Sequence, residues 1–130
     1  MISFIGAGPG DPDLLTIKGK RIIDNSDVII YTGSLVNPEV LRGAKPTARI
    51  YNSATMNLDQ VIGVMKDAES KGLKVARVHT GDPSIYGAIR EQIDRLEEVG
   101  IDSEVIPGVS SFLGVAAVLK KEYTLPSKSQ

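Results

Sequence analysis

ISFIGAGPGDP, residues 2–12, joins a short apolar run to a loop of glycine and proline. The pattern returns in ARVHTGDPSIYG, residues 76–87, and in EVIPGVSS, residues 104–111. Each of these three loops follows a strand-like run and precedes a helix-like stretch. In an open parallel sheet such loops lie at the carboxyl ends of the strands, where ligands bind. We therefore predict a ligand site at one edge of the sheet, built largely from main-chain groups.

Strand-like and helix-like segments alternate along the whole chain. Apolar runs predict strands at residues 2–5, 28–31, 48–51, 74–78 and 104–106. Helical spacing predicts one helix starting at Asp11 or Asp13, one between Asn57 and Gly72, one from Ile85 to Gly100, and one over residues 110–119. This alternation predicts an α/β domain with a mostly parallel sheet of about five strands flanked by helices.

The composition narrows the classes of function. The 130 residues suit one domain, and 42% of them are hydrophobic, which is enough for a core. The net charge is −1, from 15 basic and 16 acidic residues, whereas nucleic-acid-binding domains carry a basic excess. The chain has no cysteine and a single histidine, which excludes thiolate sites and argues against a histidine-based metal site. We therefore expect no nucleic-acid partner and no bound metal.

The sequence also predicts where the protein is located in the cell and where its domain ends. No apolar stretch is long enough to span a bilayer, and a strand beginning at Ile2 leaves no room for a signal peptide, so we expect a cytoplasmic protein without a membrane partner. Residues 110–119 are apolar nearly all round, as in a helix that is buried or covered by another surface. We predict a domain over residues 1–120 and a linker over residues 121–130.

The first loop fits a dinucleotide-binding fingerprint only in part. Gly6 and Gly8 match the first two glycines of G-x-G-x-x-G, but Asp11 stands at the third position. Asp11 would bring negative charge near a pyrophosphate, and Pro9 removes one amide donor. No Gly-Lys-Ser or Gly-Lys-Thr of a phosphate-binding loop occurs. A phosphate cradle is therefore disfavoured, and a plain tight turn and a ligand loop stay equally open.

The other two loops carry candidate side chains with structural alternatives. Asp82, between a glycine and a proline, can cap a helix or orient a polar or cationic ligand, and its neighbours Thr80 and Ser84 favour the ligand. The sequence is equally consistent with a structural His79 whose hydrogen bonds are satisfied and with a catalytic His79. Ser110 and Ser111 can cap the last helix and contact a ligand as well.

Together, the order and spacing of the three motifs resemble the tetrapyrrole methylase family, the class III S-adenosylmethionine-dependent methyltransferases. GAGPGD followed by DLLT at residues 13–16 is similar to the family opening, and GDP and PGVSS are similar to its later motifs. YTGSLV (31–36), HTGDPSIYG (79–87) and YTLP (123–126) resemble the branch that methylates C-11 of precorrin-4 or cobalt-precorrin-4 in cobalamin synthesis. Thr32 stands where the uroporphyrinogen methylases carry an acid, which argues against their substrate.

The resemblance implies an S-adenosylmethionine pocket lined by Pro9, Thr80, Gly81, Asp82, Ile85, Ser110 and Ser111. It implies that a corrinoid precursor binds beside Thr32, Gly33, Ser34, Leu35 and Val36. It also implies a second α/β domain after the linker, which completes the pocket, and a homodimer. Two alternatives stay open: a sister methylase with a different substrate, and a non-catalytic nucleotide-binding module.

Overall fold

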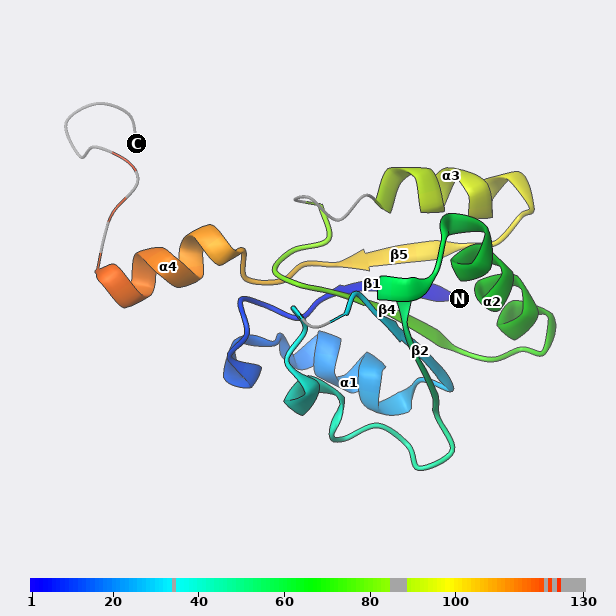
Figure 1. Ribbon diagram of the computed structural model, residues 1–130, viewed down its shortest axis with the longest axis horizontal. Coiled ribbons are helices and arrows are strands. Elements are labelled where there is room, and N and C mark those ends of the chain that lie inside the picture. Colours follow the sequence, from blue (N-terminus) through cyan, green and yellow to red (C-terminus); the bar gives the residue numbers. More distant parts are fainter. Residues whose placement is uncertain (34, 85–88, 121, 123, 125–130) are drawn as a thin grey trace.

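Five parallel strands form one sheet in the order β3-β2-β4-β1-β5, which confirms the α/β prediction (Figure 1). The computed structural model describes residues 1–33, 35–84, 89–120, 122 and 124. The predicted linker 121–130 therefore lies almost wholly outside the described residues, as do Ser34 and Ile85. The strands are β1 (Ile2–Gly6), β2 (Val28–Tyr31), β3 (Arg49–Asn52), β4 (Val75–His79) and β5 (Ser103–Ile106).

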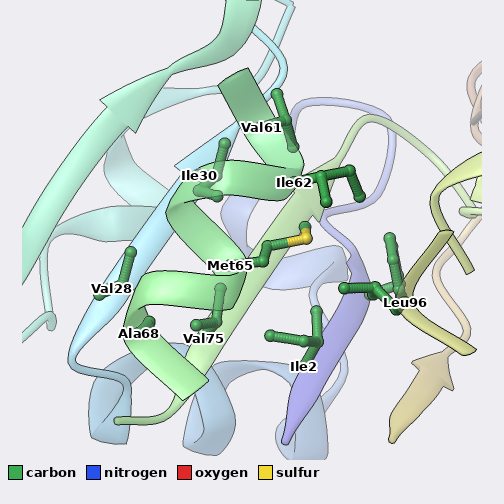
Figure 2. Packing of buried hydrophobic residues seen from close by; sticks show 10 residues of the cluster. Ile2, Val28, Ile30, Val61, Ile62, Met65, Ala68, Val75 and Leu96 are labelled. Atoms are coloured by element: carbon green, nitrogen blue, oxygen red, sulfur yellow. The ribbon is translucent and has the colours of Figure 1, made fainter. Parts of the chain in front are cut away.

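Helices cover both faces of the sheet. They are α1 (Ile17–Asn25), α2 (Leu58–Ser70), α3 (Ile89–Glu98) and α4 (Ser111–Leu119), with short 3-10 helices η1 (Pro12–Leu14), η2 (Pro38–Leu41) and η3 (Ser53–Thr55). α2 and α3 pack on one face, and α1 and η2 on the other. Figure 2 shows Met65 of α2 and Leu96 of α3 packed over the strand residues Ile2 and Val75. Each such fully buried side chain contributes about 1.5–3 kcal/mol relative to an exposed one.

The prediction of a single first helix is wrong in one respect, because the structure divides this stretch into η1 and α1. Asp11 caps η1 by accepting a hydrogen bond from the Asp13 amide at 2.9 Å, with Pro12 in the first position as predicted. Leu15 and Thr16 are then extended, and the Thr16 hydroxyl accepts from the Gly19 amide at 2.9 Å to begin α1. The apolar spacing continues across this break, so periodicity could not reveal it.

The sheet order creates a topological switch point between β1 and β4. The connection that leaves β1 runs through α1 to β2, toward the β3 end of the strand order. The connection that leaves β4 runs through α3 to β5, toward the other end of that order. The two loops therefore leave adjacent strands in opposite directions. In open α/β sheets the crevice at such a point, outside the carboxyl ends of the strands, is where ligands bind.

Helix α4 extends away from the sheet (Figure 1) and exposes most of its apolar side chains. The exposed ones are Phe112, Leu113, Val115, Val118 and Leu119. Ser110 caps this helix as predicted, accepting from the Phe112 amide at 3.3 Å. An exposed apolar surface of this kind marks a site of contact with another surface. Among the described residues, no helix combines the length and hydropathy that a membrane span requires.

We expect the chain to self-associate through α4. Val115→Lys should shift the chain toward the monomer, because it places a charge in the apolar surface of α4. Ile50→Lys is the matched control, since Ile50 is 48% exposed and Val115 is 51% exposed. Ile50 lies on β3, the outer strand on the other side of the sheet from β5, which α4 follows. Sedimentation velocity at several concentrations measures the effect. A wild-type chain that stays monomeric throughout would contradict the prediction.

Candidate functional site

The three predicted loops meet at the carboxyl edge of the sheet, and glycines allow them to do so. A Cβ placed on Gly6 would lie 2.7 Å from the Gly108 nitrogen and Cα, and one on Gly108 would lie 2.8 Å from Gly6. Both would also collide with the Gly81 carbonyl oxygen. A real Cβ essentially never comes this close to another atom, so the absence of a side chain at Gly6 and Gly108 allows main chain to pack directly on main chain.

Hydrogen bonds join the first two loops across the switch point. The Ala7 amide donates to the His79 carbonyl at 2.7 Å, continuing the pairing of β1 with β4. Gly8 and Gly81 then exchange two bonds, with N–O distances of 3.2 and 2.8 Å. Both glycines have positive φ, at 78° and 64°, which other residues rarely adopt. The switch point is therefore formed by hydrogen-bonded main chain rather than by long side chains.

Asp82 ties the second loop to the third. One carboxylate oxygen accepts from the Ser84 amide at 2.8 Å, and the other accepts from the Gly108 amide at 3.0 Å. The second bond spans 26 residues of sequence. Asp82 thus holds the second and third loops together through main-chain amides on both. Carboxylate bonds to main-chain amides are among the stronger hydrogen bonds in proteins.

Buried polar atoms at the end of β4 lack partners among the described residues. They are the hydroxyl oxygen of Thr80 and Nε2 of His79. His79 is 3% exposed and stacks on Phe4 with ring centroids 6.1 Å apart. Burial and, to a smaller extent, the charge of Arg77 lower the pKa of His79 from 6.5 to about 3. The imidazole is therefore neutral at pH 7, and the buried Thr80 hydroxyl has no partner among the described residues.

The buried His79 predicts a pH dependence of stability. In the unfolded chain this histidine takes up a proton as the pH falls through 6.5, whereas in the folded chain it does so only near 3. Stability should therefore be lost progressively below pH 6.5, with an added slope approaching about 1.4 kcal/mol per pH unit. His79→Gln removes the chain's single histidine and should flatten the curve. Urea unfolding from pH 7.5 to 4.5 measures both proteins, and parallel curves would contradict the prediction.

The segment predicted to bind substrate begins directly after β2. The Thr32 amide donates to the Val78 carbonyl at 3.1 Å, and Gly33 turns the chain with φ of 98°. Leu35 is 75% exposed, whereas Val36 is buried in the core beneath α1 and η2. Asn37, which the sequence analysis missed, donates from its side chain to the Gly10 carbonyl at 2.7 Å. Its place before Pro38 was the only local signal, and it links this segment to the first loop.

Pro9 and α4 form a groove beside the first loop. A Cβ on Gly114 would lie 2.8 Å from the Pro9 ring, so α4 packs closely on this loop. The groove has a volume of about 390 Å³ and is lined by Pro9, Asp11, Leu14, Gly114, Val115, Val118 and Leu119. A larger hollow of about 720 Å³ lies between α2 and β3 but includes no residue of the three loops. We favour the loop edge as the functional site because its polar atoms converge there.

The structure thus brings most of the predicted cofactor residues together at the carboxyl ends of the strands. Gly81 and Asp82 bridge the loops, Thr80 lies beneath them, and Pro9 and Ser110 lie where α4 joins them. Ile85 and the side chain of Ser111 lie outside the described residues, so they cannot be placed. The described residues contain no group of three or more carboxylate, histidine or cysteine side chains suited to a metal ion.

Comparison with known protein families gives a match over the whole chain. Residues 1–130 match the family described as Tetrapyrrole (Corrin/Porphyrin) Methylases. The chain is 60% identical to cobalt-precorrin-4 C(11)-methyltransferase of Methanocaldococcus jannaschii, over 99% of this chain and 50% of that protein. It therefore spans about half the length of that relative.

Solved structures agree with the sequence match. The X-ray structure of a cobalamin biosynthetic enzyme, cobalt precorrin-4 methyltransferase, superposes with a TM-score of 0.95 and 44% identity, over 99% of this chain and 54% of that one. The uroporphyrin-III C-methyltransferase of Thermus thermophilus, complexed with S-adenosylhomocysteine, superposes with a TM-score of 0.74 and 33% identity, over 88% of this chain and 47% of that one. The chain therefore belongs to the tetrapyrrole methylase family.

Proposed function

We propose that this chain forms the amino-terminal part of a methyltransferase that uses S-adenosylmethionine to methylate C-11 of precorrin-4 or cobalt-precorrin-4. The observation that carries the proposal is the meeting of three interlocked loops at the switch point, where main chain and small residues lie at the carboxyl ends of the strands. The 60% identity to an enzyme of that name supports the choice of substrate.

The groups where the three loops meet fit S-adenosylmethionine. The unpartnered Thr80 hydroxyl can hydrogen-bond a polar group of the cofactor, and Gly81 lets the cofactor approach the main chain. Asp82 accepts two amide bonds, so it holds the loops in place and adds negative charge near the cationic sulfonium. We propose a cofactor pocket formed by Pro9, Thr80, Gly81, Asp82, Ile85, Ser110 and Ser111. S-adenosylmethionine supplies a methyl group that its sulfonium has already activated.

The chain's own task in the reaction is alignment. The nucleophile is a ring carbon of the corrinoid, so the protein needs no nucleophilic side chain. The loops fix one partner, and the Thr32–Val36 segment, with Leu35 exposed, offers a surface for the other. Holding the two reactants in line and excluding water accounts for much of the rate in such reactions.

We propose that a second domain covers the place where the three loops meet, because the relative from Methanocaldococcus jannaschii is about twice as long as this chain. The exposed apolar residues of α4 offer a surface for that domain or for a second subunit in a homodimer. Residues 1–130 alone should then bind S-adenosylhomocysteine weakly, since a pocket with one wall buries only part of its ligand.

The test compares residues 1–130 with the longer protein that contains them. Each is incubated with S-adenosylmethionine and precorrin-4, cobalt-precorrin-4 or uroporphyrinogen III, and the products are identified by mass spectrometry and NMR. We expect the longer protein to yield a C-11 methylated product and residues 1–130 to yield none. Methylation by residues 1–130 alone would contradict the need for a second domain. Methylation of uroporphyrinogen III only would overturn the C-11 assignment.

A further inference from the structure

Arg77 is a charged side chain buried in the centre of the sheet. It lies on β4, is 6% exposed, and faces the α2 and α3 side, like Val75 two residues earlier. Burial lowers the pKa of Arg77 from 12.5 to about 10, so the side chain stays charged at pH 7. No described carboxylate pairs with it. A buried charge of this kind is tolerated only when hydrogen bonds satisfy it, so the positions of its acceptors are strongly constrained.

Those acceptors come from three separate elements. Nε of Arg77 donates to the Gln92 side chain on α3 at 3.2 Å. Nη1 donates to the Ile30 carbonyl on β2 at 3.3 Å and to the Ser53 hydroxyl on η3 at 3.0 Å. The Ser53 hydroxyl in turn donates to the Tyr31 carbonyl at 3.1 Å. One guanidinium therefore joins α3, which follows the second loop, to the last residues of β2 and the start of η3.

This network ends directly beneath the Thr32–Val36 segment. Thr32 follows the Tyr31 carbonyl that Ser53 holds, and the Val36 amide donates to the Gly33 carbonyl at 3.1 Å. Gly33 also packs on η3, because a Cβ placed on it would lie 3.1 Å from the Ala54 methyl carbon. A shift of η3 would therefore move the turn at Gly33.

We propose that Arg77, acting through Ser53, is a positioning residue that fixes the Thr32–Val36 segment relative to the loop after β4. The functional part of this inference rests on the proposed function, in which that segment binds the substrate and that loop binds the cofactor. Because Arg77 is buried beneath both, it acts through the Ser53 hydroxyl and two main-chain carbonyls rather than on the reactants. Its loss should slow methyl transfer more than it weakens cofactor binding.

A first test uses hydrogen exchange and does not depend on activity. Ser53→Ala removes the hydroxyl that joins Arg77 to the Tyr31 carbonyl. Ser3→Ala is the matched control, since Ser3 also donates a part-buried hydroxyl bond, to Glu104 at 2.9 Å, but at the amino edge of the sheet. We expect Ser53→Ala to speed exchange of the Thr32 and Val36 amides about tenfold or more, through local opening, while Ser3→Ala leaves them unchanged. Equal exchange in both variants would overturn the proposal.

A second test measures kinetics in the longer protein that contains this chain. Ser53→Ala should lower kcat about tenfold or more, because misaligned reactants react slowly, while the Kd for S-adenosylhomocysteine and the Tm match those of Ser3→Ala. Arg77→Lys combined with Ser53→Ala should be no slower than the slower single variant, since the two residues act in series. Additive losses, or an unchanged kcat in Ser53→Ala, would overturn the role in catalysis. A wild-type protein that methylates no corrinoid would refute the proposed function, and hydrogen exchange would still decide the positioning role.

Discussion

Replacing Gly108 by alanine should lower the free energy of unfolding by about 4 kcal/mol, at the upper end of single-substitution effects. The new Cβ would lie 2.8 Å from Gly6 and closer still to the Gly81 carbonyl oxygen. All of these are backbone atoms, so no side-chain rotation can relieve the collision, and the loops must separate. Urea unfolding of residues 1–130 measures the loss.

Gly63→Ala is the matched control for this substitution. Gly63 lies within α2, and a Cβ placed on it meets no atom within 4 Å. The same chemical change there should stabilise the chain by up to about 1 kcal/mol, because alanine is the better helix former. If Gly108→Ala unfolds within about 1 kcal/mol of the wild type, the close contact of the three loops does not exist as described.

Replacing Asp82 by alanine should lower the rate of methyl transfer by the longer protein about 100-fold. The Ser84 and Gly108 amides would both lose their acceptor, which frees the third loop from the second. The cost in unfolding free energy should be smaller, about 1–2 kcal/mol, because water can replace part of the lost bonding at this half-buried site. Steady-state kinetics and thermal unfolding of the same sample measure the two effects.

Asp27→Ala separates loop positioning from the general loss of a carboxylate. Asp27 also accepts a bond from a distant main-chain amide, that of Lys74, at 2.9 Å, but at the amino edge of the sheet. Hydrogen bonds to this amide and to Lys45 hold the pKa of Asp27 below its usual value. Asp27→Ala should lose about as much unfolding free energy as Asp82→Ala, but it should keep the wild-type rate of methyl transfer. If the two variants lose equal activity, Asp82 has no special part in the site.

Much of the fold could be predicted from the sequence because its determinants are local. The apolar run between Asp27 and Thr32 predicted β2 with its observed bounds. The cap of α2 was also predicted at Asn57, which exchanges hydrogen bonds with Gln60 in a capping box. Such features depend on residues within one turn or one strand, so a linear reading recovers them. The division of the first helix at Thr16 was missed because the apolar spacing on either side of it is continuous.

The meeting point of the three loops was also predicted, since glycine and proline after three apolar runs indicate loops at one edge of a parallel sheet. Its internal connections were not. The sequence analysis favoured a ligand role for Asp82 over a helix cap, and the tertiary structure added the bond from the Gly108 amide. His79 was left between a structural and a catalytic role, and burial made it neutral.

Arg77 shows most clearly what only the tertiary structure decided. The strand sequence around it gave no sign that a charged side chain would be buried there or what would satisfy it. Its partners lie 15, 24 and 47 residues away, and the sheet order brings them together. The sequence by itself thus determined the elements and the edge at which the three loops meet, because those follow from local spacing. The contacts that fix the loops relative to one another depend on which strands are neighbours, which no local pattern specifies.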